Sequence, residues 1–197
     1  GAGTDTLSIT TAGAAVIDGY AMAAATALNN QLSNVERVII SDAFNTGVAL
    51  DMARLDSITY IDLEAGHTGA ESLTGLANNT TVIQGAAATD GLTLTMADAS
   101  GAADVITVVL DETGANADYG SITVSAIETV NIKVSESTAS STVYVATLGA
   151  ALTTVDSVII TGADSLTTDT AFGATTIDAS GLTAGAFIMS STASGLS

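Results

Sequence analysis

The chain has 197 residues, with 21 acidic and 3 basic side chains, a formal net charge of −18 at pH 7, and no Pro, Cys or Trp. An apolar content of 47% excludes a disordered chain, and the missing Cys excludes disulfides, thiolate metal sites and a cysteine nucleophile. A surface this acidic repels nucleic acid and anionic lipid, so we expect no nucleic-acid partner and no membrane insertion. It would attract divalent cations, or it is a solvated acidic face that serves solubility.

The first thirty residues combine strand and helix patterns. Short strands are predicted at residues 6–10 and 14–17. An alanine-rich stretch follows and predicts one short helix near residues 20–30, with Asp18 placed to cap its start. We interpret residues 19–31 as a helical insertion or cap on an otherwise β-rich chain.

From residue 34 onward, β-rich runs alternate with clusters of Gly, Asn, Asp and Ser that favour turns. No second helical pattern appears, which argues against βαβ units. Residues 105–110 carry apolar side chains at both odd- and even-numbered positions. This indicates a strand covered by the core on one side and by a neighbouring strand or another copy of the protein on the other. The predicted strands are residues 36–41, 48–50, 57–63, 80–84, 92–96, 105–110, 121–124, 129–134, 142–147, 157–161, 175–178 and 186–189.

One short phrase recurs along the chain: an apolar residue, an acid, a small or polar residue, then a β-rich run. It starts at Val35, Leu55, Ile127 and Val155, and the interval is shorter between the first two copies than between the last two. Such recurrence is typical of a solenoid, in which each turn buries its apolar face against the next. We therefore predict an all-β parallel β-helix, or β-solenoid; regular short strands would also suit a β-sandwich.

The chain opens on Gly1-Ala2-Gly3 and ends on a Ser- and Gly-rich tail, and no signal peptide is recognisable. We expect residues 1–197 to form a single β-solenoid segment cut from a longer polypeptide.

Glycine–acid turns are the candidate metal sites. Gly1, Gly3 and Asp5 match the tail of the nonapeptide G-G-x-G-x-D-x-U-x, in which turn carbonyls and the Asp carboxylate bind Ca²⁺. Degenerate copies place Asp118 and Asp164 in similar turns. A further copy begins at Gly66, with Glu71 in place of Asp. The alternative is that these are acidic turns that hold no ion, because turns favour Gly and Asp in any case.

The stretch 127–132, the segment Gly101–Val105, and residues 162–167 and 175–182 resemble bacterial surface-layer (S-layer) proteins of the RTX, type I-secreted class. Related segments also occur in large RTX adhesins. The resemblance is strongest over residues 101–190, and it adds Asp104 to the candidate Ca²⁺ ligands.

This resemblance implies an extracellular, calcium-dependent β-helical protein that forms or spaces a two-dimensional lattice on the cell surface, without enzymatic activity. Its partners would be other copies of itself, and cell-surface polysaccharide bound through regions outside this chain. The tandem nonapeptides that define the strongest calcium sites of the family are nearly absent here.

Other functions have weaker support in the sequence. A ligand-binding or spacer module of an adhesin remains an alternative, and a β-helical polysaccharide hydrolase or lyase a more distant one. Any Ser-His-acid arrangement must use His67, the single histidine, which we predict to be a solvated side chain in a Gly-rich turn. Aromatic residues make up only 4% of the chain, too few for the usual sugar-binding groove.

Overall fold

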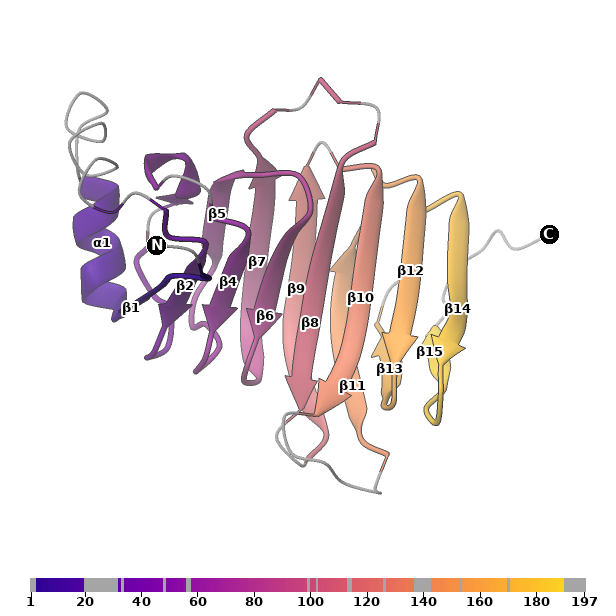
Figure 1. The fold of residues 1–197 in the computed structure, drawn as a ribbon. Helices are drawn as coiled ribbons and strands as arrows, with labels where there is room; N and C mark the ends of the chain where they lie inside the picture. Colours follow the sequence, from indigo (N-terminus) through magenta and orange to yellow (C-terminus); the bar gives the residue numbers. More distant parts are fainter. Residues whose placement is uncertain are drawn as a thin grey trace.

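The computed structural model describes residues 3–19, 32, 34–47, 49–55, 58–98, 100–101, 103–112, 115–125, 127–136, 143–152, 154–169 and 171–189. These residues form two parallel β-sheets that lie face to face, with a helix at the N-terminal end (Figure 1). The elements are β1 (Thr6–Ile9), α1 (Thr11–Gly19), β2 (Arg37–Ile40), β3 (Leu50–Asp51), the 3₁₀ turn η1 (Met52–Arg54), β4 (Tyr60–Leu63), β5 (Glu71–Leu76), β6 (Thr80–Gln84), β7 (Ala88–Met96), β8 (Val105–Glu112), β9 (Ala117–Ser125), β10 (Thr129–Glu136), β11 (Val145–Ala151), β12 (Ser157–Gly162), β13 (Ser165–Thr168), β14 (Thr176–Leu182) and β15 (Phe187–Met189).

The strand order confirms a β-solenoid. The first sheet, sheet A, has the order β1-β2-β4-β6-β8-β10-β12-β14, and the second, sheet C, has the order β15-β13-β11-β9-β7-β5-β3. From β2 onward, the chain therefore visits the two sheets alternately, and each turn of the coil adds one strand to each sheet. A β-sandwich would pair antiparallel neighbours, whereas every pairing between these strands is parallel.

The strand register shows which copies of the recurring phrase occupy equivalent positions in the solenoid. Thr129 pairs with Ser157, so the copies that start at Ile127 and Val155 are equivalent and the interval between them is confirmed. The copies at Val35 and Leu55 are not equivalent, because Arg37 pairs with Tyr60 rather than with residue 57. The interval predicted for this part of the chain is therefore too short, since the turn between β2 and β4 is longer than the phrase suggested.

Inward-facing apolar side chains stack in columns along sheet A. One column contains Val38, Ile61, Val82, Val108, Ile132 and Ile160, all fully or almost fully buried. Because strand side chains alternate between faces, a register error of two residues keeps the same residues in the core, whereas the three-residue error at the Leu55 copy exchanges the inner and outer faces of β4.

Several polar side chains of the described residues are buried, among them Gln84 and Thr80 on β6 and Thr168 on β13. Gln84 is fully buried between Leu63 and Leu110, and neither its amide nitrogen nor its amide oxygen has a hydrogen-bond partner among the described residues. The hydroxyl of the fully buried Thr168 also lacks a described partner. By contrast, the equally buried Thr80 donates its hydroxyl to the Ala77 carbonyl at 2.7 Å.

Close approach between turns requires glycine at position 120. Gly120 has a φ of 64°, and a Cβ there would overlap the Asp90 carbonyl oxygen of the preceding turn. Gly47 has a similar φ of 65° with no atom within 4 Å of such a Cβ. Gly120 is therefore required both by backbone conformation and by space.

Residues 11–19 are helical, so the strand predicted at residues 14–17 is wrong. Thr10 precedes helix α1: its hydroxyl accepts the Gly13 N–H at 3.3 Å, and its carbonyl accepts the Ala14 N–H at 2.9 Å. Ala14 and Ile17 are buried on one helical face. The helix predicted near residues 20–30 lies outside the described residues, as does nearly all of the predicted 19–31 insertion.

Candidate functional site

The predicted acids Asp5, Asp104 and Asp164 directly precede strands, and Asp118 is the second residue of β9. Among them, the Asp164 carboxylate accepts a backbone N–H of the adjacent turn and the Asp118 carboxylate accepts one of its own turn. The clearest group precedes β8, β10 and β12. Val105 pairs with Thr129 and Thr129 with Ser157. The residues just before them, Asp104, Glu128 and Asp156, therefore occupy equivalent positions in three successive turns, separated by about 4.8 Å per strand. We call these three residues the acidic column.

The members of the acidic column differ in environment. Glu128 accepts the Asp104 N–H through Oε2 at 2.7 Å. Asp104 is only 7% exposed, and its Oδ2 has no hydrogen-bond partner among the described residues. Asp156 is exposed. The column thus holds one buried carboxylate oxygen that lacks a described partner, beside two further carboxylates.

Asp118 and Asp164 belong to sheet C and do not join that column. Asp164 is 2% exposed; its Oδ1 accepts the Tyr144 N–H at 3.0 Å, and its Oδ2 has no partner in the described part of the chain. Asp118 is exposed and accepts the Gly120 N–H at 3.0 Å. Asp118 pairs with Thr147, which pairs with Thr167, so Asp118 and Asp164 lie two strands apart and at different levels.

The N-terminal candidates lie at the opposite end of the solenoid from Asp164. Gly1 falls outside the described residues. Gly3 and Asp5 are exposed, and Asp5 donates its N–H to Glu36 Oε2 at 2.8 Å. The same arrangement, a backbone N–H donated to a glutamate of the next turn, is seen at Asp104 and Glu128.

The imperfect copy of the nonapeptide that begins at Gly66 forms a buried corner. Glu71 is 2% exposed and accepts three hydrogen bonds from the previous turn, from the N–H and hydroxyl of Thr46 and the N–H of Gly47. His67 is only 1% exposed, with Nδ1 3.2 Å from the Gly69 carbonyl oxygen. The prediction of a solvated His67 is therefore wrong. His67 forms an isolated parallel bridge with Phe44 of the previous turn, a contact that no pattern in the sequence indicated.

Taken together, these acids mainly satisfy backbone donors of neighbouring turns. Among the residues that the structure describes, no group of three or more His, Asp or Glu side chains is arranged to hold a metal ion. The partial fit to Ca²⁺ is at the acidic column, where the Asp104 oxygen is available and carboxylates repeat from turn to turn. The other predicted ligands are not brought together.

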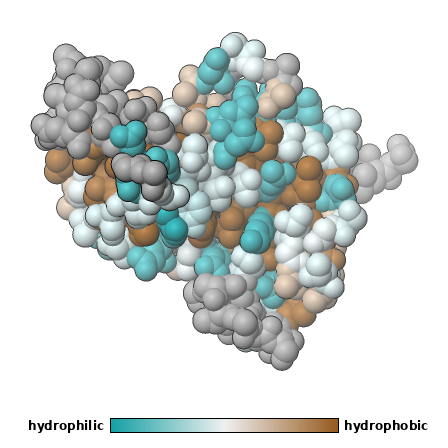
Figure 2. Space-filling view, in the orientation of Figure 1, coloured by the Kyte–Doolittle hydropathy of each residue, from teal (hydrophilic) through white to brown (hydrophobic). Residues whose placement is uncertain are grey.

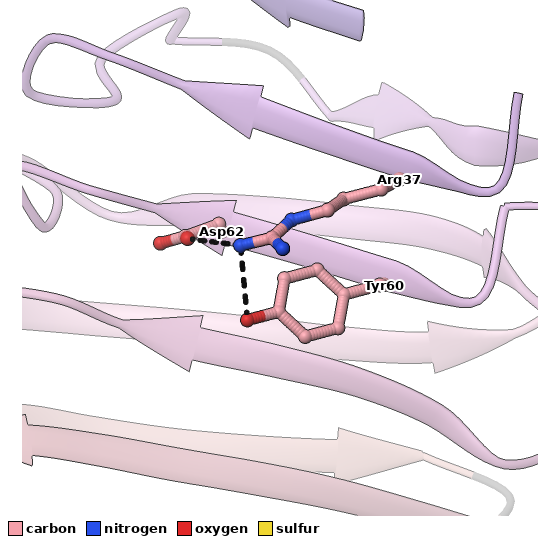
Figure 3. Close-up of polar contacts among 3 residues, drawn as sticks. All are labelled: Arg37, Tyr60 and Asp62. Carbon is pink, nitrogen blue, oxygen red and sulfur yellow. Dashed lines mark hydrogen bonds and ion pairs between the residues drawn. The ribbon is translucent and has the colours of Figure 1, made fainter. Parts of the chain in front are cut away.

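A second polar constellation, missed by sequence reasoning, lies on the outer face of sheet A (Figure 3). The Arg37 guanidinium lies 4.0 Å from the centre of the Tyr60 ring and donates to the Tyr60 hydroxyl at 3.2 Å and to Asp62 Oδ2 at 3.3 Å. Burial raises the pKa of Tyr60, and the nearby Arg37 opposes that rise. Arg37 and Tyr60 lie on different turns of the coil, so only the strand register could reveal their contact.

The sequence matches no protein-family model and no curated protein. Within the described part of the chain, no helix has the length and hydropathy needed to cross a bilayer.

Proposed function

We propose that this chain is a structural segment of a secreted bacterial surface protein of the surface-layer, RTX type. In this proposal it forms or spaces a two-dimensional lattice on the cell surface by association with other copies of itself, and Ca²⁺ stiffens it. The observation that carries the proposal is the in-register solenoid itself, which repeats carboxylates at equivalent corners in a chain of net charge −18.

The physical role of calcium follows from repulsion. Asp104, Glu128 and Asp156 lie at equivalent positions on strands that are about 4.8 Å apart. Like charges on neighbouring strands oppose stacking, and a divalent cation near the Asp104 carboxylate would turn that repulsion into attraction. Binding to the folded state alone would then raise its stability.

A structural role also agrees with the position of the single histidine. His67 is almost fully buried in a corner, with Nδ1 facing a carbonyl, so its ring does not reach a substrate in solution. We therefore propose a mechanical rather than a catalytic function. The extracellular location that we propose rests on the resemblance to surface-layer proteins.

The test compares thermal unfolding with excess Ca²⁺ and with a chelator. We expect Ca²⁺ to raise the midpoint, and the Asp104→Asn variant to lose most of that rise. Asp118→Asn is the matched control, since Asp118 is exposed and lies on the other sheet, and it should keep the full response. Equal midpoints for the wild-type chain with Ca²⁺ and with chelator would contradict the calcium dependence.

A ligand-binding module of an adhesin is the second candidate. The observation in its favour is the Arg37–Tyr60–Asp62 constellation, because stacked aromatic and charged groups on one face are common in glycan recognition. Binding to an array of surface glycans that Tyr60→Ala abolishes would favour this function over the lattice.

A further inference from the structure

The outer face of sheet A differs in charge from the rest of the molecule. Two rows of side chains cross it from strand to strand. The first contains Arg37, Tyr60, Thr81, Thr107, Asn131, Ile159 and Asp178, and the second, which we call the central row, contains Ile39, Asp62, Ile83, Val109, Lys133 and Thr161. Together these two rows carry two cations and two anions, while the next outward position on β8 adds the acid Asp111. On a chain of net charge −18, contact through these two rows therefore brings opposite charges together rather than acids alone.

This face is also partly apolar. Figure 2, in the orientation of Figure 1, shows hydrophobic side chains among polar ones across the strands of sheet A. Ile39 and Ile83 are half-buried, and Val109 is only 9% exposed although it points away from the core. Lys133 is exposed and makes no ion pair or hydrogen bond with any other described residue. The face thus presents apolar side chains beside a cation that has no acid to bind within the described chain.

The order of charges in the central row is self-complementary. Ile83 on β6 and Val109 on β8 lie at its middle, flanked by Asp62 on β4 and Lys133 on β10. A twofold axis parallel to the strands and between β6 and β8 places β4 of one copy over β10 of the other. Asp62 then faces Lys133 of the second copy twice, and Ile83 faces Val109 twice, as an isologous interface requires. The alternative twofold, along the solenoid, would place each charge opposite itself.

We propose that two copies of this chain associate face to face through the outer face of sheet A, with their solenoids antiparallel and Asp62 of each copy paired with Lys133 of the other. This rests on the proposed self-assembling function and assigns its contact face. Facing sheets pack about 10 Å apart, and the six strands from β2 to β12 offer roughly 400 Å² per copy. That area, about 800 Å² in total, is below what a stable specific interface buries, so a single contact is weak and repetition in an assembly would reinforce it.

The first experiment measures self-association by sedimentation velocity over a concentration series, with circular dichroism to verify folding. Lys133→Asp places two carboxylates opposite each other at both ends, and we expect it to weaken association about tenfold, a loss of about 1.4 kcal/mol. The double variant Asp62→Lys with Lys133→Asp restores opposite charges and should recover wild-type association. The double variant Thr123→Asp with Ser125→Asp is the control for net charge: it adds the same two negative charges at exposed positions of β9, on the other sheet, and should not weaken association.

A second experiment leaves every charge in place. The chain has no cysteine, so Ile39→Cys and Thr161→Cys each introduce a unique thiol. In the proposed pair, Ile39 on β2 faces Thr161 on β12 of the other copy, whereas two Ile39 residues are separated by five strand spacings, about 24 Å. A short bis-maleimide should therefore cross-link an equal mixture of the two variants and neither variant alone.

The outcomes separate this inference from the proposed function. If the wild-type chain associates but Lys133→Asp associates equally well, or if each cysteine variant cross-links to itself, the face or its symmetry is wrong and self-assembly stands. If the wild-type chain stays monomeric at every concentration, with and without Ca²⁺, both the inference and the lattice proposal fail.

Discussion

Two buried threonines provide a matched test of how a hydrogen bond changes the stability cost of burying a hydroxyl group. Thr168 and Thr80 are both fully buried, but only Thr80 has a described hydrogen-bond partner for its hydroxyl, the Ala77 carbonyl at 2.7 Å. Thr→Val keeps the shape of the side chain and removes the hydroxyl. At Thr168 the change removes a desolvated hydroxyl, which costs about 1–3 kcal/mol when unpaired, and we expect a gain in stability of about 1 kcal/mol. At Thr80 it removes a hydrogen bond, and we expect a loss of about 1 kcal/mol.

The measurement is thermal and urea unfolding of the two single variants beside the wild-type chain. For a chain of this length, about 1 kcal/mol corresponds to a shift in Tm of about 2–4 °C, so the two variants should move in opposite directions. A lower Tm for Thr168→Val would mean that its hydroxyl is hydrogen-bonded in the folded protein, and it would refute the reasoning from burial.

Three further predictions concern other features of the fold. Gln84→Leu should stabilise the protein by about 1–3 kcal/mol, measured by urea unfolding, because it replaces an amide buried without described partners; a destabilised variant would show that the amide is satisfied. Gly120→Ala should destabilise by more than about 2 kcal/mol, and Gly47→Ala, with the same backbone but open space, by only about 1 kcal/mol, measured as Tm; equal losses would remove the packing argument. The Ser180 hydroxyl lowers the pKa of the exposed Asp178 carboxyl, so Ser180→Ala should raise that pKa in a carboxyl NMR titration. The contribution of this bond to stability is present above the unfolded-state pKa and is lost as the pH falls through the lowered folded-state value.

Sequence periodicity predicted the architecture well because it depends on residue type at alternate positions. The strand at Val105–Leu110 could be recognised from its apolar run, and the stacking of equivalent strands from the phrases at Ile127 and Val155. Turn lengths were not predictable to the residue, because loops of different length connect equivalent strands. Helix α1 was missed for a related reason: its β-branched residues suggest a strand, while the Thr10 cap and burial against the end of the solenoid favour a helix.

The candidate site was predicted in part. Asp104 and Asp164 do lie at corners, but their buried settings depend on residues of neighbouring turns, Glu128 and Tyr144. The same is true of Arg37 and Tyr60. Contacts between turns are decided by the register, which periodicity alone leaves uncertain by a few residues.

The uneven turn lengths have a consequence for how such a chain can change. Thr129, Ser157 and Thr176 occupy equivalent positions in successive turns, yet the segment that joins the first two is clearly longer than the segment that joins the last two. Residues inserted or deleted at a corner therefore need not displace the stacked columns on either side. Loops on this scaffold are free to acquire new surface features while the rod beneath them keeps its dimensions.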